Sequence, residues 1–107
     1  MDLVGLVGRA AMPLEELVQQ KRAEIAAIAA KHGVQAVRVV GSVARGNSRD
    51  DSDLDLLVTP GPRTSSWFPG GLISDLETLL QRRVQIVTEA GLRPELRESV
   101  LRDARPL

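Results

Sequence analysis

The segment at residues 41–58, GSVARGNSRDDSDLDLLV, most constrains how this chain can fold. Aliphatic residues precede it, and they also alternate with the acids of its second half, where Leu54 separates Asp53 from Asp55. Side chains of a β-strand point alternately to opposite faces, so both aspartates are predicted on one face and the leucines on the other. The pattern predicts a strand, a glycine turn, a short helical turn at residues 42–45, a polar loop and a second strand.

The two aspartates are candidate metal ligands. A surface turn of solvated acids would account for the acids of the loop, but unpaired carboxylates inside an aliphatic strand are costly. A hard cation such as Mg²⁺ relieves their repulsion and keeps its remaining positions for water and phosphate oxygens. Gly41 lets the backbone approach an anion, and Ser42 offers a hydroxyl and free helical N–H groups. A metal site beside a phosphate cradle predicts phosphoryl or nucleotidyl transfer.

The same residues resemble the signature of a known family. GSVARG followed by SDLDLLV is similar to the motif of the minimal nucleotidyltransferases of the DNA polymerase β superfamily, and the similarity extends over about residues 14–107. The resemblance implies a Mg²⁺-dependent enzyme that moves a nucleoside monophosphate, AMP from ATP being the expected case, onto a hydroxyl. It implies catalytic, metal-binding roles for Asp53 and Asp55, and nucleotide-binding roles for Gly41, Ser42 and Arg45.

Many members of this family are antitoxins encoded beside HEPN toxins, and some transfer AMP to a tyrosine of the toxin. The resemblance therefore implies a HEPN-family toxin as the partner. The chain itself contains no tyrosine, which excludes modification of its own tyrosines. It is also too short to carry a separate acceptor domain, so the acceptor is expected on another protein.

One position departs from the family pattern. The superfamily uses a third carboxylate on a neighbouring strand, and the matching residue here is Gln85. An amide oxygen can touch a cation, but it carries no charge and cannot act as a base. Two explanations stay open: an antitoxin that works by binding alone, or a slow transferase whose site the toxin completes. An engineered substitution is a further alternative, and Glu89 lies past the strand and is not expected to replace the missing acid.

Three functions are compatible with these observations. The first is a toxin-modifying nucleotidyltransferase, and the second is a binding-only antitoxin. The third and weaker one is the small catalytic subunit of a two-component transferase that acts on a small molecule, such as an antibiotic hydroxyl.

Composition narrows the class of protein. A chain of 107 residues is expected to form one domain, at residues 13–107, after an arm at residues 1–12 that is frayed, a short helix or sequence upstream of a natural start at Met12. Acids and bases balance at 14 each, which argues against direct nucleic-acid binding. With no cysteine, no membrane-length apolar run and no basic leader, a cytoplasmic location is expected. Homodimerisation is left open.

Hydrophobic periodicity predicts an α/β (α+β) fold with a small mixed β-sheet flanked by helices, as in polymerase-β-like nucleotidyltransferases. Helices are expected at about residues 13–31, 72–81 and 94–104, and strands at about residues 35–40, 53–58 and 83–88. The last helix carries an apolar stripe of Leu96, Val100 and Ala104.

Several single residues invite a functional interpretation. His32, the only histidine, is interpreted as a dipole partner in the last turn of the first helix rather than as a general base. Lys21 interrupts the apolar stripe of that helix, and its amine is expected to reach water. Arg45 is expected either to reach a phosphate or to pair with an acid of the following loop. Trp67 and Phe68, the only aromatic residues, either cover the core edge or contact another protein.

Overall fold

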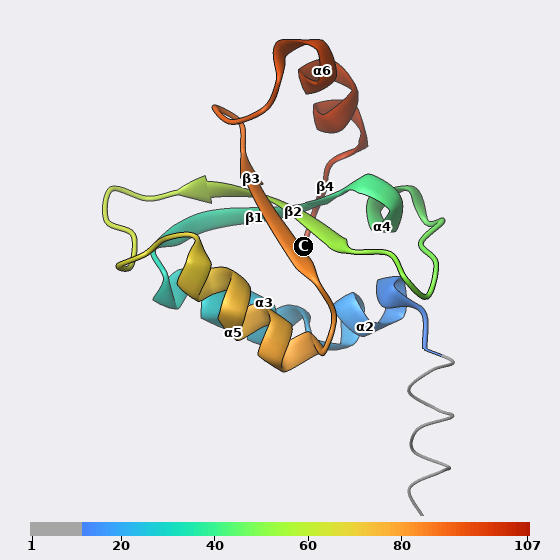
Figure 1. Ribbon diagram of the computed structural model, residues 1–107, viewed down its shortest axis with the longest axis horizontal. Helices are drawn as coiled ribbons and strands as arrows, with labels where there is room; N and C mark the ends of the chain where they lie inside the picture. Colours follow the sequence, from blue (N-terminus) through green and yellow to red (C-terminus); the bar gives the residue numbers. More distant parts are fainter. Residues whose placement is uncertain (1–11) are drawn as a thin grey trace, which may run out of the picture.

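The computed structural model describes residues 12–107 (Figure 1). Its elements in chain order are α2 (Leu14–Gln20), α3 (Arg22–Lys31), β1 (Val34–Val40), α4 (Gly41–Arg45), β2 (Leu54–Pro60), α5 (Gly70–Leu80), β3 (Val84–Thr88), α6 (Pro94–Asp103) and β4 (Arg105–Pro106). Apart from Met12, the predicted arm at residues 1–12 lies outside the described residues. No helix between residues 12 and 107 combines the length and apolar character needed to cross a membrane.

The strands form a four-stranded sheet in the order β3-β2-β1-β4. β2 runs parallel to β3, whereas β1 is antiparallel to both β2 and β4. Figure 1 places α2, α3 and α5 on one side of the sheet, while α4 lies at one end and α6 stands on the other side. This arrangement confirms the predicted fold class of a small mixed sheet flanked by helices.

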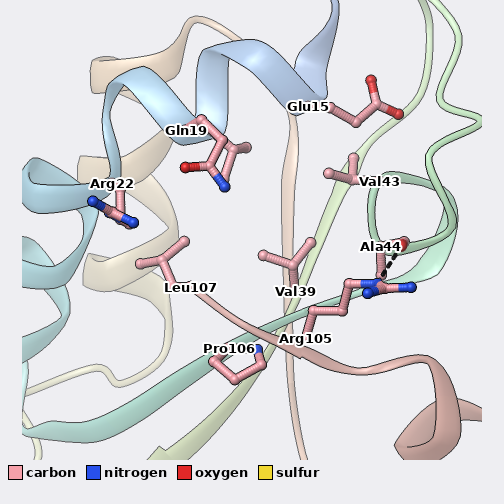
Figure 2. Close-up of a pocket in the computed structure, with 10 residues that line it drawn as sticks. Glu15, Gln19, Arg22, Val39, Val43, Ala44, Arg105, Pro106 and Leu107 are labelled. Atoms are coloured by element: carbon pink, nitrogen blue, oxygen red, sulfur yellow. Dashed lines mark hydrogen bonds between the residues drawn. The ribbon is translucent and has the colours of Figure 1, made fainter.

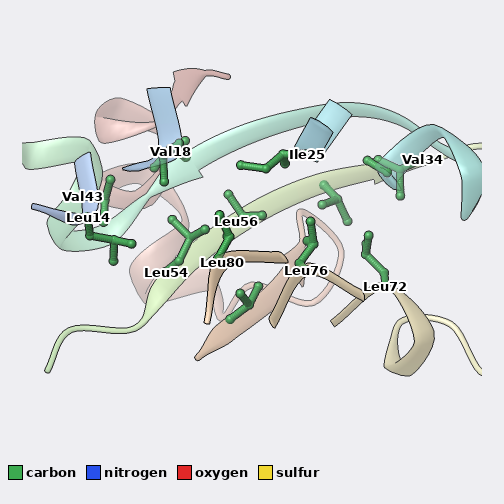
Figure 3. Close-up of a cluster of buried hydrophobic side chains, with 14 of the residues drawn as sticks. Leu14, Val18, Ile25, Val34, Val43, Leu54, Leu56, Leu72, Leu76 and Leu80 are labelled. Carbon is green, nitrogen blue, oxygen red and sulfur yellow. The ribbon is translucent and has the colours of Figure 1, made fainter. Parts of the chain in front are cut away.

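The core lies between the sheet and the layer of α2, α3 and α5, as Figure 3 shows. Alternate residues of β2 point into this core, and Leu54, Leu56 and Val58 are at most 1% exposed. Leu72, Leu76 and Leu80 meet them from α5 at the spacing of one helical face. Each fully buried aliphatic side chain stabilises the fold by roughly 1.5–3 kcal/mol, so this face supplies most of the packing energy.

The first predicted helix is wrong in one respect, since two helices, α2 and α3, replace it and meet at Lys21. Lys21 leaves helical geometry with φ −100° and ψ 11°, yet its N–H still bonds to Leu17 and its carbonyl still accepts from Ile25. The interruption is therefore a kink. It occurs where a charged residue falls on the apolar stripe, and Lys21 turns outward to pair with Glu24 at 3.7 Å.

The predicted apolar stripe of the last helix is not buried as expected. α6 has no buried residue, and Leu96 is 50% exposed. Polar contacts attach α6 to the body, as described below, so its sequence pattern does not correspond to a core-facing side. The two-residue strand β4 that follows α6 was not predicted, because so short a strand leaves no periodic signal.

Candidate active site

The acids predicted to share one face do so. Asp55 lies in β2, between Val40 of β1 and Gln85 of β3 in the sheet register. Asp53 lies just before β2 rather than inside it, a small correction to the predicted bounds. The alternation of strand side chains puts both acids on the face opposite to the α2–α3–α5 layer. We call the face that carries Asp53, Asp55 and Gln85 the acidic face.

Gly41 brings the turn after β1 directly against Asp55. Its φ is +74°, and a Cβ built there would lie 2.5 Å from Asp55 Oδ2. Only glycine fits this position, because the backbone conformation disfavours other residues and the carboxylate fills the space. The predicted helical turn is present as α4, so the N–H groups of its first residues lack intrahelical partners. The turn and the carboxylates therefore form one continuous site.

The electrostatics of the acidic pair fit a bound cation. Burial of the Asp55 side chain raises its pKa, the neighbouring charge of Asp53 raises it further, and the charge of Arg45 opposes both. Within residues 12–107 neither Asp53 nor Asp55 forms an ion pair with a basic side chain. Two adjacent oxygen donors without a cationic partner are the donor set that Mg²⁺ accepts. In the same part of the chain no group of three or more histidine, cysteine or acidic residues could hold a metal.

Gln85 occupies the acidic face as predicted, and it forms a contact that the sequence did not indicate. Its Nε2 donates a hydrogen bond to Asp53 Oδ2 over 3.0 Å. Glu89 does not replace the missing acid, because Arg38 holds it at 2.7 Å and Arg97 at 3.0 Å. The described site therefore contains two carboxylates and one amide.

Arg45 does not pair with the acids of the loop, which was one of its two predicted partners. Its Nη1 instead lies 3.7 Å from Asp103 Oδ2 at the end of α6. Its guanidinium is about half exposed and still influences the pKa of Asp55, so it remains on the side of the carboxylates. Asp103 is a residue of this site that sequence reasoning missed.

His32 lies at the end of α3 as predicted, and it makes side-chain contacts that the sequence did not indicate. The ring is buried, with Nδ1 2.6 Å from Ser65 Oγ and Nε2 2.7 Å from Asp75 Oδ2. His32 precedes β1, whereas the carboxylates lie beside the far end of that strand, whose seven residues span about 20 Å at strand spacing. The histidine thus joins α3, α5 and the loop at residues 61–69, and it lies outside the acidic site.

The two aromatic residues of that loop lie in different surroundings, and only Phe68 covers the core edge as predicted. Phe68 packs against the core, whereas Trp67 is 91% exposed and adopts a φ of +65°. The loop is tied down because Ser65 N–H bonds to the His32 carbonyl at 3.1 Å and Gly61 N–H to the Gly33 carbonyl at 2.7 Å. Trp67 is therefore presented to solvent on an anchored loop.

Two hollows adjoin the site. One of about 420 Å³ lies beside Asp53, and Arg82 borders it by donating to the carbonyls of Asp50 and Ser52 at 2.9 and 3.0 Å. The other, of about 180 Å³, lies behind α4 between α2, β1 and the C-terminal residues (Figure 2). The first hollow shares Asp53 with the acidic face.

Comparison with known proteins gives a consistent result. A family model described as a nucleotidyltransferase domain matches residues 21–107. Protein adenylyltransferase MntA of Thermococcus cleftensis is 33% identical over 94 residues, covering 88% of this chain and 95% of the relative. MJ0435 of Methanocaldococcus jannaschii, whose name assigns it provisionally to the protein adenylyltransferases, is 31% identical over 87 residues, covering 81% and 94%.

Solved structures agree with this result. One, described provisionally as a minimal nucleotidyltransferase, has a TM-score of 0.78 and 46% identity, and the match covers 91% of this chain and 99% of that one. A toxin–antitoxin crystal structure with AMP-PNP has a TM-score of 0.66 at 19% identity, covering 78% and 69%, which supports the shared fold alone.

Proposed function

The chain belongs to the nucleotidyltransferase domain family, and from this premise we propose that it is an antitoxin that transfers AMP from ATP to a hydroxyl of its partner toxin. The observation that carries the proposal is the pair Asp53 and Asp55 on one face of the sheet, with Asp55 held against the Gly41 turn. Acids beside a glycine turn match the needs of a metal-bound triphosphate. The relatives named protein adenylyltransferases support the choice of AMP and of a protein acceptor.

In the proposed mechanism the chain's own groups bind and orient the triphosphate. Backbone N–H groups at the start of α4 and the hydroxyl of Ser42 donate to its phosphate oxygens, and Arg45 adds positive charge. Asp53 and Asp55 would hold Mg²⁺, with the Gln85 amide beside them, and the bound ion supplies charge stabilisation to the reacting phosphates. The 3.0 Å contact from Gln85 Nε2 to Asp53 leaves the other carboxylate oxygens free for this purpose.

The proposed reaction is an in-line displacement at the α-phosphorus. The acceptor hydroxyl oxygen forms the new bond, the bond from the α-phosphorus to its bridging oxygen breaks, and pyrophosphate leaves. The hydroxyl proton passes to water, because Asp53 and Asp55 are assigned to the cation, Glu89 is held by two arginines, and Gln85 cannot accept it. Fixed donors around the phosphates accelerate the step chiefly through orientation and charge.

We assign the acceptor to a HEPN-family toxin. The family resemblance supports this partner, and toxin–antitoxin complexes of the same fold make an acceptor on a second chain reasonable. The exposed site suits such an acceptor, since α6 flanks the acidic face without covering it with buried side chains.

Intact-mass spectrometry tests this function directly. The candidate toxin is incubated with this protein, Mg²⁺ and each nucleoside triphosphate in turn. We expect a mass gain of one or more AMP groups with ATP, and no gain when a chelator removes Mg²⁺. A gain with another triphosphate would correct the nucleotide, and no gain with any of them would contradict transfer to this partner.

The hydrogen bond from Gln85 to Asp53 favours a second candidate, a binding-only antitoxin. An amide in place of a third acid leaves the metal less strongly held and the acceptor without a base. In that case the wild-type chain forms a stable complex that suppresses toxicity without a mass gain, and Gln85→Glu gains transfer activity. If Gln85→Glu is also inactive in a stable complex, the missing carboxylate is not the cause. A small-molecule acceptor is the weaker alternative, in which the added mass appears on the small molecule.

A further inference from the structure

The helix that carries the phosphate cradle is too short to be stable by itself. α4 has five residues, and isolated helices of that length do not repay the cost of nucleation. Val43 and Ala44 bury one side of it, and Gly46, at a φ of +75°, ends it. The carbonyls of Ser42 and Val43 accept from the N–H groups of Asn47 and Gly46 at 3.0 and 3.1 Å, whereas the carbonyl of Ala44 needs a partner from elsewhere in the chain.

The C-terminal segment supplies that partner. Arg105 Nε donates to the carbonyl of Ala44 over 2.9 Å, across a separation of 61 residues, as Figure 2 shows. A guanidinium suits a helix C-terminus because it meets the negative end of the helix dipole. Asp103 lies 3.7 Å from the guanidinium of Arg45, the last residue of α4. One short segment thus contacts both the backbone and a side chain of the helix.

The strand β4 explains how so exposed a segment keeps its place. Arg105 pairs with Val39 and Pro106 with Arg38 in the antiparallel register with β1. Leu107 N–H adds a bond to the carbonyl of Val37 at 3.2 Å. Because β1 runs directly into α4, the strand that precedes the cradle also anchors the segment that supports it.

We propose that Asp103 and Arg105 are positioning residues for triphosphate binding, holding α4 so that Gly41, Ser42 and Arg45 face the phosphates. The inference rests on the proposed function, since it concerns the same cradle. Neither residue is expected to touch the reacting atoms. Their loss should therefore weaken triphosphate binding more than it slows the saturated reaction.

A pair of arginine variants tests this inference. Arg105→Met and Arg102→Met each remove one guanidinium and keep an alkyl stem, but within residues 12–107 the one acid that Arg102 pairs with is Glu98 of its own helix, at 3.1 Å. We expect Arg105→Met to raise the Kd of Mg–ATP, measured by isothermal titration calorimetry, about tenfold. Arg102→Met should stay within about twofold, which controls for the lost charge. KM should rise with Kd while kcat changes by less than about twofold.

Two further variants protect the test against misfolding. Arg105→Lys keeps a donor near Ala44 and should recover most of the affinity. Asp103→Asn removes only the charge opposite Arg45 and should raise Kd about threefold at low salt, with a smaller effect at high salt. If folded Arg105→Met binds Mg–ATP as the wild type does, or if Arg102→Met weakens binding equally, the inference is wrong. If Arg105→Met is unfolded, a wild-type Kd for Asp103→Asn at low salt would overturn it. Failure of the wild type itself to bind triphosphate would instead contradict the proposed function.

Discussion

The two faces of the sheet use alternate residues of the same strands and are stabilised in different ways. On the face covered by α2, α3 and α5, residues such as Leu54 and Leu56 are completely buried. On the acidic face, Leu57 is also buried, but its neighbours Asp55, Gln85 and Arg38 make polar contacts or carry unpaired charge. The comparison teaches that one face provides stability, while the other keeps electrostatic repulsion that Arg45 only partly offsets and that a bound cation would relieve.

Removing the two acids should give the largest effect. Asp53→Asn combined with Asp55→Asn is expected to weaken Mg²⁺-dependent ATP binding by more than about a thousandfold, because the donor set for the cation is lost. The fold should survive, since the substitution removes repulsion and no apolar contact. The measurement is calorimetric titration with and without Mg²⁺.

Asp50→Asn with Asp51→Asn is the matched control for that variant. Both loop acids are exposed, so their loss should change ATP binding by less than about twofold. Unchanged binding in the Asp53 and Asp55 double variant would remove the assignment of the active site.

Two leucine substitutions test how much stability the buried face of the sheet provides. Leu56→Ala should lower the free energy of unfolding by about 3 kcal/mol, because it leaves a cavity in the buried face. Leu96→Ala on α6 should cost less than about 1 kcal/mol, since that side chain is 50% exposed. Denaturant unfolding followed by circular dichroism gives both values. Equal losses in the free energy of unfolding would show that Leu96 contributes to packing as much as a core leucine does.

A single substitution, Gly41→Ala, should change both the stability of the fold and the affinity for Mg–ATP. The added Cβ would collide with Asp55, and the residue would be strained at a φ of +74°. We expect a loss of about 1–2 kcal/mol in the free energy of unfolding and a roughly tenfold rise in the Kd of Mg–ATP. Gly70→Ala is the control, because nothing lies within 4 Å of a Cβ there and no positive φ applies. A silent Gly41→Ala would contradict the close approach of turn and acid.

The smallest effect concerns pH. The pKa of Asp55 is raised in the folded chain, mainly by burial and then by Asp53, so the folded state takes up this proton first as pH falls. Asp55→Asn should therefore be more stable than the wild type above the folded pKa, and the difference should shrink as pH falls towards the ordinary value of 3.8.

Asp75 should behave in the opposite way. The hydrogen bond from His32 is the main cause of its lowered pKa, so its stabilising contribution is present above 3.8 and is lost as pH falls through the folded value. Asp75→Asn should be less stable than the wild type at neutral pH, with the gap closing in acid. Unfolding curves over pH 3–7 give the stability of each variant relative to the wild type. A change of the same sign for Asp55→Asn and Asp75→Asn at neutral pH would refute this contrast.

The sequence predicted the parts of the molecule that follow local rules. Alternation around Leu54 put Asp53 and Asp55 on one face. The short helix after Gly41 followed from the glycine turn and the polar loop. These features depend on neighbouring residues, so no knowledge of the tertiary structure was needed.

Side-chain partners across the fold were not predictable. His32 meets Ser65 and Asp75 at separations of 33 and 43 residues, and nothing in their local patterns selects them. The pairing of Arg45 with Asp103 likewise depends on where β4 places the end of α6. The family resemblance suggested a nucleotide-side role for Arg45 but gave no indication of the residue that holds it.

The placement of Trp67 decides what optical spectroscopy can report. It is the only tryptophan, the chain has no tyrosine, and the indole is 91% exposed at the end of β2 opposite the carboxylates. Its fluorescence should already resemble that of an indole in water, so unfolding of the core will hardly shift the emission. A second protein that covered the anchored loop would shift that emission to shorter wavelength. The intrinsic fluorescence of this protein is therefore a poor probe of folding and a sensitive one for assembly at that end of the sheet.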